Sequence, residues 1–212
     1  MSYNLVKRLI DIILGTFLVI IFAPVCLLVA LAIKIDSYGP VLADTPMRVG
    51  KNGKLFKMYK FRSMISNAHR ILRVNPRFKN LYSQYKKNSY KLKEDPRITR
   101  VGRFIRKHSL DEIPQFWNVL KGEMSMVGPR AYYTDELEDQ QKKYPQTRDL
   151  VKVVLSTRPG ITGSWQVSGR SEINFDRRIA MDADYVRKKS IFYDTLIIIR
   201  TPWAMISGKG AM

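Results

Sequence analysis

Two adjacent carboxylates, Asp111 and Glu112, are the residues of this sequence best placed to do chemistry. They follow the most basic part of the chain and precede a predicted helix that begins near Ile113. One carboxylate of such a pair can attack phosphorus and form an acyl phosphate. The other can hold Mg²⁺, which neutralises a diphosphate and its leaving group. The pair therefore indicates phosphoryl-transfer chemistry.

The same segment also has a purely structural interpretation. Ser109 and Glu112 have the spacing of a capping box, and acidic residues are common in the first turn of a helix. Pro114 weighs against this alternative, because it would then be the fifth helical residue, whereas proline prefers the first. If Pro114 begins the helix, the carboxylates lie in the lead-in loop, where free helix amides can hold phosphate. Both interpretations remain open on the pattern alone.

Basic and glycine-rich segments surround the pair. Arginine guanidinium groups suit phosphate oxygens, and the candidates are Arg100, Arg103, Arg106 and Arg130, although each alone is typical of a solvated surface. Residues 158–170 could contact a ligand through their backbone, but ordinary turn chemistry explains their glycines equally well. The sequence has no Walker-type loop, and its two histidines and single cysteine argue against a structural zinc site.

Positive charge is concentrated in one stretch of the chain. The formal net charge is +19, and residues 48–107 hold 19 Lys or Arg against only Glu94 and Asp95. Such a field attracts lipid head groups, nucleotides or nucleic acid. Two rival functions follow, a membrane-anchored lipid-binding protein and a nucleic-acid binder. The apolar N-terminal segment argues against the second.

That N-terminal segment is uncharged over the 22 residues from Ile12 to Ile33, which is long enough to cross a bilayer. It is too long for a secretory signal, and no clear cleavage site follows it. Basic residues flank it on both sides, and a single crossing cannot keep both flanks in the cytoplasm. Pro24 favours a kink near the middle. We therefore prefer, by a small margin over a kinked span, a helix that enters the cytoplasmic leaflet and bends back.

The remaining elements follow from turn signals and periodicity. Residues 51–54 predict a hairpin, residues 64–93 predict short helices and loops, and Pro159-Gly160 predicts a turn. The last helix is expected to break near Pro202, and it could lie on the membrane surface or in the core. Helices are predicted over residues 99–107, 113–120, 134–143, 176–188 and 191–206.

A series of short motifs runs in one order from residue 7 to residue 170. The motifs are Lys7-Arg8-x-x-Asp11, Asp36-x-x-Gly39-Pro40, Phe56–Met64, Asp95–Gly102, Ser109–Gln115, Lys121–Arg130 and Pro159–Arg170. Any one motif is weak, but the ordered set is highly specific, and it closely resembles the bacterial sugar transferases of the monotopic phosphoglycosyl transferase superfamily.

The resemblance implies an α/β mixed, mostly helical fold in two parts. Residues 1–38 would form a re-entrant membrane helix hairpin. Residues 39–212 would form a small cytoplasmic catalytic domain with a short β-hairpin and amphipathic helices on the membrane surface. This monotopic arrangement implies the cytoplasmic face of the bacterial inner membrane. Expected partners include anionic phospholipids of the inner leaflet but no nucleic acid, and a homodimer is left open.

The resemblance also implies a two-step reaction that initiates assembly of a bacterial surface glycan. Asp111 attacks the sugar-linked phosphate of a UDP-sugar and releases UMP, and polyprenyl (undecaprenyl) phosphate then takes the phosphosugar. Glu112 is the partner of Asp111 at Mg²⁺, with Mn²⁺ as the alternative ion, so both carboxylates are expected metal ligands. Expected substrate contacts are Lys60, Arg62, Arg106, Arg130, Arg158, Gln166 and Arg170.

Some positions depart from the family pattern. Ala23 precedes Pro24 where the family often has serine, so a hydroxyl that could satisfy a freed carbonyl is missing. Residues 44–47 stand where a glutamine-containing strand is expected, and residues 75–93 are longer and more basic than in compact members. The chain lacks the extra N-terminal spans of longer members, so we expect the short catalytic form. Nothing in these motifs identifies the sugar, the glycan pathway or the source.

Overall fold

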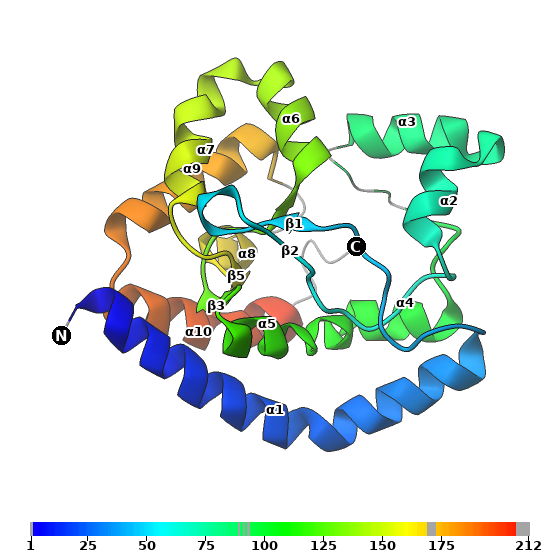
Figure 1. Ribbon diagram of the computed structural model, residues 1–212, viewed down its shortest axis with the longest axis horizontal. Helices are drawn as coiled ribbons and strands as arrows, with labels where there is room; N and C mark the ends of the chain where they lie inside the picture. The colour runs from blue at the N-terminus through cyan, green and yellow to red at the C-terminus, as the bar shows by residue number, and fades with distance from the viewer. Residues whose placement is uncertain (1, 89, 91, 93, 169–172, 207–212) are drawn as a thin grey trace.

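The computed structural model describes residues 2–206, apart from residues 89, 91, 93 and 169–172. Helices form most of it, so the mixed α/β, mostly helical fold class is confirmed. In Figure 1 the long helix α1 (Tyr3–Asp36) runs along one side of the molecule. Three helices lie in a row beside it, α4 (Arg100–Lys107), α5 (Gln115–Lys121) and α10 (Ile191–Ile206).

Two small sheets lie between these helices and the rest. The first sheet is antiparallel, in the order β2 (Leu55–Phe56), β1 (Arg48–Val49), β4 (Tyr132–Tyr133), and the second pairs β3 (Ser125–Val127) with β5 (Gly160–Thr162) in parallel. The predicted hairpin is confirmed. Its turn, η1 (Lys51–Gly53), has Asn52 at φ 56° and Gly53 at φ 78°, which these two residue types adopt most readily.

Most predicted helices are present. The basic helix is α4, whose capping residue Thr99 accepts a hydrogen bond from the Gly102 amide. The predictions for residues 134–143 and 191–206 coincide with α6 and α10, and α9 begins one residue before its predicted start. The other elements are α2 (Ala68–Val74), η2 (Pro76–Phe78), α3 (Lys79–Lys87), η3 (Leu110–Glu112), α6 (Thr134–Lys143), η4 (Pro145–Thr147), α7 (Arg148–Leu155), α8 (Ser164–Ser168) and α9 (Phe175–Lys188).

Two local predictions were wrong. Gly160 does not belong to a turn but opens β5, where the two strands approach so closely that a Cβ on it would lie 2.0 Å from the Gly128 nitrogen. A glycine is needed there because any side chain would separate the strands. Helix α10 does not break at Pro202. Its preceding turn is held in the core by Ile197, which outweighs the single backbone hydrogen bond that proline removes.

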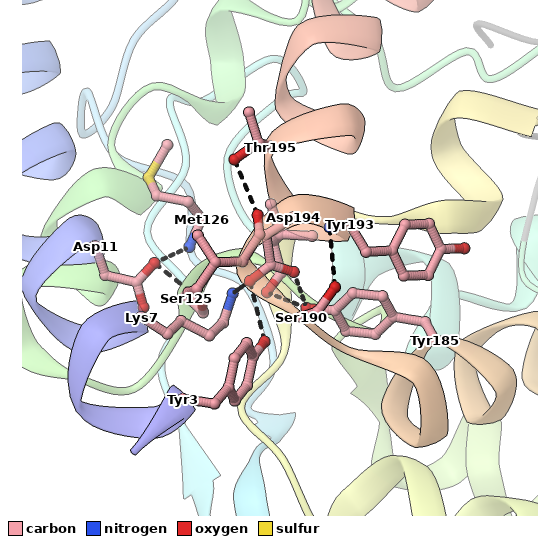
Figure 2. Close-up of polar contacts among 12 residues, drawn as sticks. Tyr3, Lys7, Asp11, Ser125, Met126, Tyr185, Ser190, Tyr193, Asp194 and Thr195 are labelled. Carbon is pink, nitrogen blue, oxygen red and sulfur yellow. Dashed lines mark hydrogen bonds and ion pairs between the residues drawn. The ribbon is translucent and has the colours of Figure 1, made fainter. Parts of the chain in front are cut away.

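The first turns of α1 are tied to the other end of the chain by a polar network, shown in Figure 2. The Asp194 carboxylate on α10 accepts hydrogen bonds from the Tyr3 hydroxyl at 3.0 Å, the Lys7 ammonium at 2.6 Å and the Tyr185 hydroxyl at 2.6 Å. One turn further along α1, buried Asp11 accepts hydrogen bonds from the backbone and side chain of β3. The start of α1 is therefore fixed to α10 and to the central sheet.

The end of α1 is held by the same domain. The Arg62 guanidinium donates to the carbonyl oxygens of Ile33, Ser37 and Tyr38 at the end of the helix. The Asp36 carboxylate accepts a hydrogen bond from the first turn of α4. Between its two ends α1 is one helix with Pro24 inside it, and Figure 1 shows it bent near the middle. Its length and apolar composition suffice to cross a membrane.

Exposed apolar side chains are concentrated on α1 and on the helices beside it. Helix α1 contributes most of this surface, including Ile13, Ile20 and Leu28, and α10 adds Trp203 and Phe192. Because α10 also buries Ile197 and Asp194, it serves both as a core helix and as part of this surface. Exposed apolar side chains gathered on neighbouring helices mark a membrane or protein contact, and we call this surface the apolar face. Other exposed members are Phe17, Leu27, Leu31, Phe104, Trp117 and Ile199.

Candidate functional site

The carboxylate pair lies in the short 3₁₀ turn η3, between the end of α4 and the start of α5. Ser109 enters this turn with φ 54° and makes no capping hydrogen bond through its side chain, so the predicted capping box is absent. Helix α5 starts at Gln115 rather than at Ile113, with Pro114 as its capping residue. The carboxylates therefore lie in the lead-in to the helix, which was the alternative that favours a chemical role.

Lys60 holds the two carboxylates together. Its ammonium lies 2.6 Å from a Glu112 oxygen and 3.7 Å from an Asp111 oxygen. Burial alone would lower the pKa of Lys60, but the charges of Glu112 and Asp111 outweigh it, and the pKa is raised. Lys60 is therefore a fixed positive charge beside the pair, as expected for a residue predicted to contact substrate phosphate.

Asp111 is the more buried of the two acids, with 8% of its surface exposed. Burial raises its pKa above the usual range, Lys60 lowers it and Glu112 raises it further. The charge of Arg106 on α4 also acts on Asp111 and lowers its pKa. The structure thus brings Lys60, Arg106 and both carboxylates to one site, whose buried Asp111 is poorly hydrated and suited to attack an electrophile.

Arg130 approaches the same site from the loop after β3. Burial alone would lower the pKa of Arg130, but Glu136, two tyrosine hydroxyls and Glu112 together outweigh it, and the pKa is raised. The Arg130 side chain lies 3.9 Å from Glu136, and its backbone nitrogen donates to Asp182 at 3.1 Å. Arg178 lies 3.7 Å from the same Glu136 oxygen.

Glu136, Asp182 and Arg178 form a frame, completely buried, behind Arg130. Burial raises the pKa of Asp182 to about 7. The Arg130 and Arg178 guanidinium groups lie 5.6 Å and 5.4 Å from the ring of Trp165. This frame was not predicted, because the sequence separates Glu136 from Arg178 and Asp182 by more than forty residues. The one signal was the i, i+4 spacing of Arg178 and Asp182, which is usually a surface ion pair.

The remaining residues predicted to contact substrate do not lie beside the carboxylates or are not described. The Arg62 guanidinium binds the carbonyl oxygens at the end of α1 rather than the carboxylates, and its role in substrate binding stays a prediction. Arg158 lies in the backbone segment packed against Gly128, and the Gln166 amide donates to the Ile161 carbonyl at 3.3 Å, so both border the Arg130 loop rather than the carboxylates. Arg170 lies outside the described residues.

The site can be tested for its fit to Mg²⁺. Across the described part of the chain, no three His, Cys, Asp or Glu side chains gather to form a complete metal cage. Mg²⁺ is often held by one or two carboxylates together with substrate phosphates, and Asp111 with Glu112 supplies that donor set. Lys60 covers one oxygen of each acid. The residues therefore fit an ion that arrives with a diphosphate, and the ion itself stays a prediction.

Comparison with known proteins gives consistent similarities. The family model for bacterial sugar transferase matches residues 2–208. An uncharacterised sugar transferase of Haemophilus influenzae is 43% identical over 100% of this chain and 43% of its own length. The undecaprenyl-phosphate galactose phosphotransferase of Salmonella typhimurium is 41% identical over 99% of this chain and 42% of its own length.

A third relative has a similar length. The exopolysaccharide production protein ExoY of Rhizobium meliloti is 37% identical over 98% of this chain and 88% of its own length. The chain thus spans less than half of the first two relatives and most of the third.

Proposed function

Because the chain belongs to the bacterial sugar transferase family, we propose that it transfers a sugar phosphate from a UDP-sugar to polyprenyl phosphate. The relatives named for undecaprenyl-phosphate sugar transfer support the acceptor, and the one named for exopolysaccharide production supports a role in surface glycan synthesis. The observation that carries the proposal is the buried carboxylate of Asp111, held beside Glu112, Lys60 and arginine side chains.

In the first step an Asp111 oxygen forms a bond to the sugar-linked phosphorus of the donor. The bond from that phosphorus to the bridging oxygen breaks, and UMP leaves with the electron pair. Lys60, Arg106 and Arg130 supply positive charge where the phosphate oxygens must lie. The frame behind Arg130 fixes its backbone and orients its guanidinium. Mg²⁺, held by Glu112 and Asp111, would neutralise the diphosphate.

In the second step a phosphate oxygen of the acceptor attacks the phosphosugar on Asp111. The aspartate oxygen leaves, and a polyprenyl diphosphate sugar is formed. Lys60 stays within reach of both acids during the exchange, so it can stabilise the carboxylate that is regenerated. A single site then serves donor and acceptor in turn.

We also propose that α1 is re-entrant and that the domain lies on the cytoplasmic face. A straight helix of 34 residues is about 50 Å long, whereas the hydrocarbon core is about 30 Å thick. A full span would carry one end away from the domain. The contacts of Lys7 with Asp194 and of Arg62 with Ile33 hold both ends against one body, which supports the re-entrant arrangement.

The proposed activity is tested with membranes that contain the protein and a panel of UDP-sugars. We expect UMP release with one or a few of the sugars, and its loss in excess chelator with recovery on adding Mg²⁺. Full turnover in excess chelator would refute the metal requirement. No UMP release with any donor, from protein shown to be folded, would refute the reaction itself.

A further inference from the structure

An apolar cavity of about 380 Å³ lies between the middle of α1 and the start of α5. Its wall residues include Val19 and Cys26 of α1, Leu42 and Phe61, and Ile113 and Trp117. Val19 and Cys26 are two helical turns apart and share one face of α1, with Pro24 between them. On either side of the cavity α1 packs closely on the domain, at Gly15 and at Val29. The cavity therefore lies at the bend of α1.

The cavity adjoins the carboxylate pair. Phe61 lines it and donates its backbone N–H to the Asp111 carbonyl at 2.9 Å, and Ile113 lines it one residue after Glu112. Tyr59 also lines the cavity, whereas Lys60 between them reaches the carboxylates. In an extended chain, successive side chains point to opposite sides, as Tyr59, Lys60 and Phe61 do here. One side of the segment therefore faces the reacting groups and the other faces the cavity.

The cavity is also continuous with the exposed apolar face. Trp117 belongs both to its wall and to that surface, and Leu42 is a second wall residue that is exposed. Its polar lining is confined to one edge, where the Lys121 ammonium donates to the Tyr59 hydroxyl at 2.7 Å. A ligand suited to this space has a hydrocarbon part that enters from the apolar face and an anionic end beside the carboxylates.

We propose that this cavity seats the first isoprene units of the polyprenyl phosphate acceptor. The inference rests on the proposed function, because only an acceptor must join a hydrocarbon to a phosphate at Asp111. A water molecule occupies about 30 Å³ in the liquid, so the cavity has room for about a dozen groups of that size. If each carbon of the lipid is counted as one such group, the cavity holds about two to three five-carbon units. The rest of the chain extends over the apolar face into the lipid. A phospholipid acyl chain is the competing occupant, and the tests separate the two.

Cys26 is the only cysteine of the chain and lines the cavity, so it reports on occupancy without any substitution. Wild-type protein in lipid nanodiscs is treated with N-ethylmaleimide, and the intact mass gives the labelling rate. We expect undecaprenyl phosphate to slow labelling in a saturable way, and phosphatidic acid at equal concentration to leave the rate unchanged. Equal protection by both lipids, or by neither, would overturn the proposal.

A second test fills the cavity. Cys26→Trp places a large ring in the wall, and Leu27→Trp places the same ring at the next residue, which is exposed on the apolar face. We expect Cys26→Trp to raise the acceptor KM about tenfold or more, because it displaces buried hydrocarbon. Leu27→Trp should keep the wild-type acceptor KM.

The donor half-reaction distinguishes a failure of the proposed transfer activity from a failure of the cavity as the acceptor site. UMP release and phosphosugar attachment without acceptor involve no isoprene, so Cys26→Trp should retain both at the wild-type rate. If wild type itself fails to form the phosphosugar-protein, the proposed function is wrong. If it forms and the acceptor KM of Cys26→Trp is unchanged, the cavity is not the acceptor site. If Cys26→Trp does not fold, the labelling of wild-type Cys26 decides alone.

Discussion

At the scale of single residues, two opposing effects set the pKa of Asp111. Burial makes its carboxylate harder to ionise, and Lys60, at 3.7 Å, makes it easier. A nucleophile benefits from this balance, because a poorly hydrated carboxylate is reactive while the nearby ammonium favours its charged form. The adjacent Glu112 shares the same ammonium and so links the protonation of the two acids.

This balance predicts that substitutions of Lys60 and Glu112 shift the pH dependence of the first step in opposite directions. Asp111 must be ionised to attack, and its pKa is raised, so kcat/KM should fall as the pH drops through a value above 3.8. Lys60→Met removes a charge that lowers this pKa and should move the acidic limb to higher pH. Glu112→Gln removes a charge that raises it and should move the limb to lower pH.

The measurement is the rate of UMP release against pH, with the metal ion held in excess. Lys54→Met, an exposed lysine in the hairpin, serves as the control and should leave the limb in place. Shifts in the same direction for Lys60→Met and Glu112→Gln would show that Asp111 is not the titrating group.

The frame behind Arg130 makes a separate prediction. Glu136 is completely buried between Arg130 and Arg178, so Glu136→Gln leaves the buried Arg178 and the half-buried Arg130 short of a counter-charge. The free energy of unfolding should fall by about 3–5 kcal/mol, read as a lower melting temperature in detergent. Glu138→Gln, on the exposed side of α6, should change it by about 0.5 kcal/mol or less. Equal melting temperatures for the two variants would contradict the frame.

Sequence reasoning found the carboxylates because adjacent acids and Pro114 leave a local signature. It also selected Lys60, Arg106 and Arg130 through the resemblance to a family. It did not anticipate that the Arg62 guanidinium binds the end of α1, because that contact joins segments 25 to 29 residues apart. It missed Glu136 as well, since this buried residue belongs to a helix whose mostly polar sequence is typical of a solvent-exposed helix.

At the scale of elements, α1 is fixed at both ends and bent between them. The Lys7–Asp194 ion pair is largely buried and joins the first helix to the last, as Figure 2 shows. A long helix that rests on one body at both ends cannot pivot freely. The bend at Pro24 then becomes part of the site, because it lies beside the cavity next to the carboxylates.

Asp194→Asn should therefore loosen the start of α1. It removes the partner of the Lys7 ammonium and should lower the free energy of unfolding by about 3 kcal/mol, with faster hydrogen exchange over residues 3–10. Asp184→Asn is the matched control, because its ion pair with Lys188 is exposed and should contribute about 0–1 kcal/mol. Wild-type hydrogen exchange over residues 3–10 in both variants would contradict the claim that Asp194 fixes the start of α1.

The helices were largely predictable because periodicity and caps are local. The sheets were not, apart from the hairpin. Strand β4 joins β1 across more than eighty residues, and β3 joins β5 across more than thirty, with only two or three residues in each strand. Strands this short carry too little pattern to be recognised, and their pairing depends on the helices packed around them.

At the scale of the whole molecule, the apolar face and the basic helices α2 and α3 have separate places. The apolar face is formed by α1 with α4, α5 and α10, and in Figure 1 the basic α2 and α3 lie on the side away from α1. If the apolar face lies in the inner leaflet, α2 and α3 point into the cytoplasm. The inner-leaflet phospholipids and the homodimer expected from sequence stay predictions.

This arrangement predicts that both ends of α1 face the cytoplasm. Single cysteines at Ser2 and Tyr38, introduced with Cys26→Ser, should resist a membrane-impermeant thiol reagent added to intact cells. Both should react after the cells are opened, since Ser2 and Tyr38 are exposed. Labelling of exactly one of the two positions from outside would establish a full span and contradict the re-entrant helix.

The central claim is that Asp111 carries the phosphosugar, and intact-mass measurement after mixing the protein with a UDP-sugar and no acceptor tests it most directly. Wild type should gain the mass of one phosphosugar and release about one UMP per site. Asp111→Asn keeps the shape of the side chain but should gain no mass and lose turnover by several orders of magnitude while staying folded. A folded Asp111→Asn protein that turns over at the wild-type rate would contradict the covalent mechanism and leave direct transfer between donor and acceptor.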